Sequence, residues 1–229
     1  MRTSICPTHP PKRPAQRARP SLHSPERLGE GRSWAMRVTL DWNQLIDIHE
    51  GSGDIEGLHQ LIALQSEGAL RFCIPAIQAS EKQRDGTTLD SYSKFRAFAE
   101  SLGLGDYEEL KPPLYIGMAY IGHCVIHGTG MERLERQIHD ILFPNVRFSY
   151  PDHLAELGPR VTQRHRESWR NAKCDVLSMW SHIHYDADIF VTTDRDFHKA
   201  SKKPRLIALG AGQICTPSEC VSAIEGTRP

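Results

Sequence analysis

The chain has 229 residues, enough for one globular domain with an appendage and for a sizeable hydrophobic core. Its 28 basic side chains equal its 28 acidic ones, which excludes a protein whose whole surface is built to attract polyanions. Six scattered cysteines without a preceding apolar signal segment, and no run of about 18 apolar residues, argue against a secreted disulfide scaffold and a membrane span. We expect a cytoplasmic protein with reduced thiols.

Charge is unevenly distributed between the first 35 residues and the rest. This stretch has seven basic side chains against two acidic ones, which leaves 21 basic against 26 acidic in the remainder. It also has six prolines, which break helices and remove backbone donors, and almost nothing apolar to bury. We therefore predict a disordered basic tail over residues 1–35 and a single domain over residues 36–229, with Met36 as a candidate alternative start.

Strands and helices alternate from Met36 onward. Apolar residues with a period of two indicate strands, and apolar residues that recur three and four positions apart indicate helices. The first part of the domain is predicted to contain a strand ending at Asp41, a helix over residues 54–64 capped by Asp54, a strand over 70–74 stopped by Pro75, and a helix over 76–83.

The end of the chain repeats this alternation, whereas the middle is less regular. The end is predicted to contain a helix over residues 172–184, strands over 189–192 and 206–209, and a helix over 217–224 entered at Thr216. The enlarged middle segment, residues 86–165, is predicted to contain helices around 95–102 and 134–142, while 114–126 fits either a strand or a buried helix. The alternation predicts a three-layer α/β/α fold with a central, mainly parallel sheet.

Five acidic residues stand where such a sheet would bring them together. In an open parallel sheet, ligands bind beyond the carboxyl ends of the strands, so acids at the strand exits converge there. Taken singly, each acid is an ordinary turn, cap or helix-surface residue, but their joint order indicates a site. The candidates are Asp41 at the exit of the first strand, Glu81 in the helix after the second, Asp175 near the start of the penultimate helix, and Asp194 and Asp196 after the 189–192 strand.

In these motifs the chain resembles the PIN domain family. The resemblance is carried by Asp41-Trp42-Asn43, by Ser80-Glu81, by Asp175 at 19 residues before Asp194, and by Val191-Thr192-Thr193-Asp194-Arg195-Asp196-Phe197. It covers residues 36–85 and 170–224. The resemblance implies that Asp41, Glu81, Asp175 and Asp194 bind metal and are catalytic, that Asp196 is an accessory catalytic acid, and that Asn43 and Thr192 support them.

The family resemblance also implies an activity and partners. It implies a Mg²⁺- or Mn²⁺-dependent endoribonuclease that hydrolyses RNA, with a small inhibitory protein as partner if the chain is the toxin of a toxin-antitoxin pair. A homodimer is left open, and the long middle segment leaves the substrate class open. The chemistry gives an independent reason for such acids, because a hard divalent cation prefers oxygen ligands and lowers the pKa of the attacking water. Without a cation, clustered carboxylates should raise one another's pKa.

Two basic clusters flank the acids. They are Arg160, Arg164, Arg166, Arg170 and Lys173, and Arg195, Lys199, Lys202, Lys203 and Arg205. They fit either a rim that holds a nucleic-acid backbone or a solvated charged face.

Two hypotheses other than a nuclease are open for this sequence. One is a PIN-like module without catalysis that binds nucleic acid or serves as a scaffold. Another is a phosphatase with Asp41 as nucleophile, which would want a second Asp where Asn43 stands. The histidines and cysteines lack the paired spacing that a structural zinc site needs.

Overall fold

The computed structural model describes residues 35–81, 89, 91–126 and 128–227. The predicted tail over residues 1–35 lies outside the described residues apart from Ala35, as do residues 82 and 83 of the predicted 76–83 helix. The chain divides into one unit before Ala35 and one from Ala35 onward, and every element named below belongs to the second.

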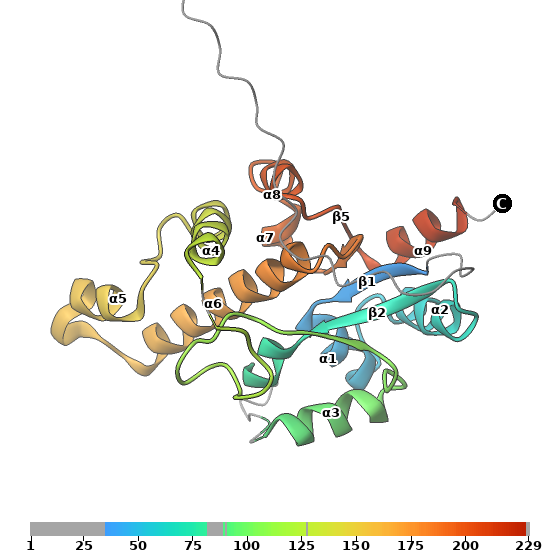
Figure 1. The fold of residues 1–229 in the computed structure, drawn as a ribbon, viewed down its shortest axis with the longest axis horizontal. Coiled ribbons are helices and arrows are strands. Elements are labelled where there is room, and N and C mark those ends of the chain that lie inside the picture. Colours follow the sequence, from blue (N-terminus) through green and yellow to red (C-terminus); the bar gives the residue numbers. More distant parts are fainter. Residues whose placement is uncertain (1–34, 82–88, 90, 127, 228–229) are drawn as a thin grey trace, which may run out of the picture. The chain divides into compact units, whose positions relative to one another are not determined.

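Five parallel strands form the centre of this unit (Figure 1). They are β1 (Met36–Leu40), β2 (Leu70–Pro75), β3 (Glu108–Leu110), β4 (Ile189–Val191) and β5 (Gln213–Cys215). Their order is β3-β2-β1-β4-β5, and Val38 of β1 lies in register with Phe72 of β2 and Ile189 of β4. The strand order reverses between β1 and β4. In open parallel sheets the ligand crevice lies at the carboxyl ends of the strands beside such a reversal.

Helices cover both faces of the sheet and so bury the strands on both sides. Val38 and Leu40 belong to the core on one face, and Phe190 and Ile214 to the core on the other. The predicted α/β fold is therefore confirmed, with a sheet that is parallel throughout. The first face packs against α1 (Trp42–Glu50), α2 (Ile55–Ser66), α3 (Tyr92–Ser101) and α9 (Pro217–Glu225), and the second against α4 (Thr129–Leu142), α6 (Gln163–His184), α7 (Arg195–His198) and α8 (Lys203–Leu209).

Most predicted elements outside the middle segment are confirmed. The Asp54 side chain accepts a hydrogen bond from the Gly57 amide and caps α2, and Thr216 caps α9 in the same way. The helix predicted over residues 172–184 is the second half of α6, which begins at Gln163. Inside the middle segment, the helices predicted around 95–102 and 134–142 are also found, as α3 and α4.

Two of the predicted elements are wrong in type. Residues 206–209 lie in helix α8, which has Pro204 in its first turn and Gly210, with φ 109°, as its C-cap. The edge strand β5 begins at Gln213, four residues after the last residue of α8. Leu206 is buried and Ile207 is exposed, so this short apolar run presents one face of a helix to the core. The described part of the 76–83 helix is the 3-10 helix η1 (Ala76–Ser80), which stops before Glu81.

The segment over residues 114–126 is neither strand nor buried helix. It is a loop with one isolated bridge, between Pro113 and Val125. Ile116, Ile121 and Ile126 are 92%, 94% and 86% exposed, whereas Met118 is buried in a small core cluster with Ile77 and Trp169. Beyond this loop, the unpredicted elements are α1, β3, α5 (Tyr150–Leu157) and the short η2 (Gly158–Arg160). Among the described residues, every helix is too short or too polar to cross a bilayer.

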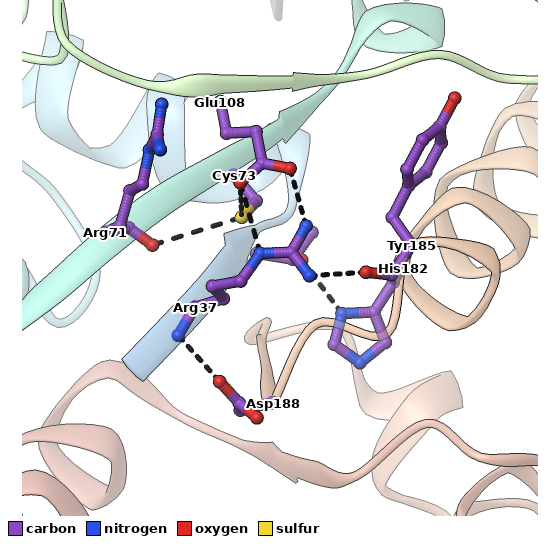
Figure 2. A network of polar contacts seen from close by, with 8 residues as sticks. Arg37, Arg71, Cys73, Glu108, His182, Tyr185 and Asp188 are labelled. Atoms are coloured by element: carbon purple, nitrogen blue, oxygen red, sulfur yellow. Dashed lines mark hydrogen bonds and ion pairs between the residues drawn. The ribbon is translucent and has the colours of Figure 1, made fainter. Parts of the chain in front are cut away.

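A polar network near the amino ends of the strands fixes α6 against the sheet (Figure 2). Arg37 of β1 pairs with Glu108 of β3 at 2.6 Å and donates to the carbonyl of Tyr185 at the end of α6. His182 of α6 contacts the Thr39 hydroxyl at 2.8 Å and the Ala211 carbonyl at 2.7 Å, and burial lowers the pKa of this histidine to about 4.

This anchoring determines where the middle of α6 lies. Asp175 precedes His182 by seven residues, which is about two helical turns or roughly 10 Å toward the carboxyl ends of the strands, on the same helix face. Thr39, the partner of His182, precedes Asp41 by two residues in the same direction. The network therefore brings Asp175 toward the carboxyl end of β1.

Candidate active site

Asp41 marks the carboxyl end of β1 and is almost fully buried, with 3% of its surface exposed. It is the N-cap of α1, and its Oδ1 accepts a hydrogen bond from the Trp42 amide at 2.9 Å. Its Oδ2 accepts from the Thr192 hydroxyl at 2.7 Å. Both oxygens therefore have defined partners, and the carboxylate is held in one orientation.

The exit of β4 brings a second acid to the same place. The Asp194 amide donates to the Thr192 hydroxyl oxygen at 3.0 Å, so one threonine is bonded to Asp41 and to the backbone of Asp194. Asp194 is the N-cap of the four-residue helix α7 and accepts from the Asp196 amide at 2.8 Å. Because β1 and β4 are paired neighbours, these two exits are adjacent.

Glu81 and Asp175 complete a cleft with Asp194. Glu81 follows η1 in an extended conformation, and Asp175 lies midway along α6 rather than near the start of a penultimate helix. Glu81 lies outside a helix because η1 ends at Ser80, before the predicted end of that helix. Asp175 lies midway along α6 because α6 begins at Gln163, nine residues before the predicted start, and the helices α7, α8 and α9 follow it. The cleft has a volume of about 280 Å³, and its lining residues are Trp42, Asn43, Glu81, Asn171, Asp175 and Asp194.

The acids of the cleft repel one another. Burial raises the pKa of Asp41 to about 6, and the negative charge of Asp194 adds to this rise. Burial also raises the pKa of Glu81 well above its ordinary value, with further contributions from Asp175 and Asp41. The pKa of Asp175 rises for the same reasons, through burial first and then through Asp41 and Asp194. A cation would remove this mutual repulsion.

The oxygen atoms of the cleft are of the kind that bind a metal ion. The Glu81 Oε1 atom is buried and has no hydrogen-bond partner among the described residues, which is costly unless something else binds it. The available donors are carboxylate and amide oxygens, which Mg²⁺ and Mn²⁺ prefer. In the described part of the chain, no three His, Cys, Asp or Glu side chains stand close enough to hold a metal as they are. The donor types therefore fit a hard cation, and binding requires the carboxylates to move closer.

Asp196 differs from the other four acids. It forms ion pairs with Lys199 and with Lys202, the second at 2.9 Å, and these bonds lower its pKa. It does not line the cleft. Its charge contributes to the raised pKa of Asp175, so it acts on the cleft through the electrostatic field.

Some polar residues around the cleft were not predicted. Asn171 lines it from α6, one turn before Asp175, and the spacing of four residues on a helix was the signal that would have revealed it. Gln78 donates to the Leu40 carbonyl at 2.8 Å, and Gln44 donates to the Thr193 hydroxyl at 3.1 Å. Both glutamines are fully buried, which their sequence positions do not indicate.

The two predicted basic clusters are partly used inside the protein. Lys173 is buried in an ion pair with Glu135, and so it does not belong to a surface rim. Arg170 donates to backbone carbonyls, and Arg166 donates to the Tyr150 hydroxyl. Five of the remaining members are exposed, namely Lys199, which pairs with Asp196, and the arginines Arg160, Arg164, Arg195 and Arg205.

No protein-family model, curated protein or solved structure matches this chain. The PIN resemblance therefore remains a prediction that rests on the motifs around Asp41, Glu81, Asp175 and Asp194.

Proposed function

We propose that this protein is a divalent-metal-dependent nuclease of the PIN type that hydrolyses phosphodiester bonds in RNA. The observation that carries the proposal is the clustering of Asp41, Glu81, Asp175 and Asp194 at the strand-order reversal, with one buried Glu81 oxygen left without a partner. Acids from four distant parts of the sequence meet there. Such a costly arrangement is typical of a functional site.

Glu81, Asp175 and Asp194 line the cleft and would hold Mg²⁺ or Mn²⁺, while Asp41 is buried and interacts with all three electrostatically. When bound, such a cation neutralises phosphate charge and lowers the pKa of an attacking water. Thr192 fixes the orientation of Asp41 and the backbone of Asp194. This prepares the acids for a common ligand in the way that outer hydrogen bonds orient metal ligands elsewhere.

The neutral donors of the cleft suit the substrate. Asn43 and Asn171 are exposed residues whose amide groups can donate hydrogen bonds to phosphate oxygens without adding charge. Arg195, which is exposed and lies between Asp194 and Asp196 in the sequence, can attract the phosphate backbone. The acids alone would repel it.

The phosphatase alternative needs an accessible nucleophile, and Asp41 is 3% exposed with both oxygens hydrogen-bonded. The alternative without catalysis, a nucleic-acid-binding or scaffold module, is favoured by the spacing of the acids, which do not form a ready-made metal site among the described residues. The raised pKa values of Glu81 and Asp175 weigh against it, because a scaffold gains nothing from such repulsion.

The test is a cleavage assay on the full chain with end-labelled RNA and DNA, in Mg²⁺, Mn²⁺ or excess EDTA. We expect RNA to be cut only with a cation, and Asp194→Asn to abolish cleavage. Asp140→Asn, on the exposed surface of α4, is the matched control and should retain activity. Undiminished cutting in EDTA would disprove the metal-dependent proposal, whereas cation-stabilised protein that binds RNA without cutting it would support the scaffold.

A further inference from the structure

Glu81 holds its place in the cleft without help from a long element of secondary structure. It is the first residue after the five-residue helix η1, and its amide donates to the Gln78 carbonyl at 3.0 Å. Its backbone is extended, with φ −81° and ψ 156°. Asp41, in contrast, lies between a central strand and a helix. Something outside the local chain must keep Glu81 in position.

Arg170 of α6 makes the contacts that fill this need. Its Nε and Nη2 atoms donate to the Ser80 carbonyl at 3.3 and 3.1 Å, and its Nη1 atom donates to the Gly117 carbonyl at 2.9 Å. One guanidinium thus joins the residue before Glu81 to the 114–126 loop. The Ser80 hydroxyl bonds to the Met118 carbonyl, which closes the same junction from the other side.

The helix that carries Arg170 also carries Asp175 and Asn171, which line the cleft. A shift of Ser80 relative to α6 would therefore separate Glu81 from Asp175. The Arg170 charge lies close enough to Glu81 to oppose the repulsion from Asp175. Its hydrogen bonds nevertheless go to carbonyl oxygens in two different segments, a geometry that the planar fork of arginine can satisfy and the single ammonium of lysine cannot.

We propose that Arg170 is a positioning residue, which fixes Glu81 in the carboxylate cleft by holding the Ser80 and Gly117 carbonyls together. This inference rests on the metal-binding role proposed for the cleft. The electrostatic and positioning roles predict opposite effects on cation affinity. Removing a positive charge near a cation site should by itself strengthen binding, whereas releasing Glu81 should weaken it.

The experiment measures Mn²⁺ affinity of the full chain by titration calorimetry, with no substrate present. We expect Arg170→Ala to weaken Mn²⁺ binding about tenfold, within the range seen when residues that orient metal ligands are changed. Arg170→Lys, which keeps the charge and loses the fork, should weaken binding nearly as much. The control is Arg166→Ala, one turn earlier on α6, whose side chain contacts the Tyr150 hydroxyl. It should leave the affinity within about twofold of wild type.

A double-mutant cycle with Glu81→Gln separates positioning from general damage. If Arg170 acts through Glu81, adding Arg170→Ala to Glu81→Gln should cost less than a further twofold in Mn²⁺ affinity. Independent, multiplying effects, or an unchanged or stronger affinity in Arg170→Lys, would overturn the inference and leave the nuclease proposal standing. Absence of Mn²⁺ binding by the wild-type chain, together with absence of cleavage, would overturn both. If Arg170→Ala does not fold, the cycle is completed with Arg170→Lys.

Discussion

The central strands beside the carboxylate cleft and the 114–126 loop of the middle segment are held in different ways. In the sheet, β1 pairs with a strand on each side and has helices on both faces, so the backbone that carries Asp41 is held from every side. In the middle segment, the sheet gains one three-residue edge strand, β3. In the 114–126 loop the Gly117 and Met118 carbonyls accept hydrogen bonds and Met118 is buried, while Ile121 is 94% exposed. The strands are fixed by packing on both faces, whereas the loop is fixed by a few hydrogen bonds and by the buried side chain of Met118.

The largest effect is expected at the cleft, from Asp175→Asn. The change keeps the shape of the side chain and removes one of several repelling charges, so the metal-free variant should be at least as stable as wild type. Loss of a ligand should reduce cleavage by at least about a hundredfold. A hundredfold excess of Mn²⁺ over Kd should stabilise wild type by about 2.7 kcal/mol and the variant far less. The measurements are paired thermal melts and cleavage rates, and equal responses to Mn²⁺ would remove Asp175 from the site.

A pH dependence of stability should follow from Asp41. Its folded-state pKa of about 6 lies above the value in the unfolded chain, so the folded state binds the proton more tightly. The resulting stabilisation is complete below about pH 4 and is lost as pH rises through 6. For roughly two pKa units this amounts to about 3 kcal/mol.

Urea unfolding of EDTA-treated protein between pH 4.5 and 7.5 measures this contribution. Wild type should lose stability with rising pH relative to Asp41→Asn, which cannot ionise at this position. Saturating Mn²⁺ should reverse the trend, because bound cation favours the ionised acids. Parallel curves for wild type and Asp41→Asn without metal would show that Asp41 does not carry the raised pKa.

How far the sequence could predict these regions depends on whether the interactions are local. Asp41 and Asp194 were predictable, because each follows a short buried strand and caps the next helix. Helix α1 is not predicted, because only Asp41 separates it from β1 and it has nine residues, so its short apolar pattern merges with that of the strand.

The conformation of Glu81 and the burial of Lys173 depend on residues far away in the chain. η1 stops at Ser80, whose carbonyl bonds to Arg170, 90 residues later. Lys173 was predicted in a basic rim, but it pairs with Glu135 inside the protein, 38 residues earlier. The edge strand β3 has two consecutive glutamates, and the Arg37 partner of Glu108 lies 71 residues away. Periodicity has no access to such pairs.

A smaller effect is expected from Thr192→Val, which keeps the side-chain shape and removes the hydroxyl that bonds Asp41 and the Asp194 amide. Buried polar groups that lose a partner cost about 1–3 kcal/mol. Cleavage should fall about tenfold, the lower end of the range for residues that orient metal ligands. Thr192→Ser retains the hydroxyl and should recover most of both losses. If Val and Ser behave alike in unfolding and cleavage assays, the hydroxyl does not orient the acids.

The smallest effect on stability is expected in the 114–126 loop of the middle segment. An isoleucine can be changed to alanine both there and in the sheet, so the two costs can be compared. Ile74 in β2 is fully buried, whereas Ile121 in the 114–126 loop is 94% exposed. Truncating Ile74 to Ala leaves a cavity and should cost about 2–5 kcal/mol of unfolding free energy. Truncating Ile121 to Ala removes no core contact and should change stability by less than about 0.5 kcal/mol. Urea unfolding of both variants makes the comparison directly. A cost at Ile121 approaching that at Ile74 would mean that Ile121 is packed against the protein in solution rather than exposed.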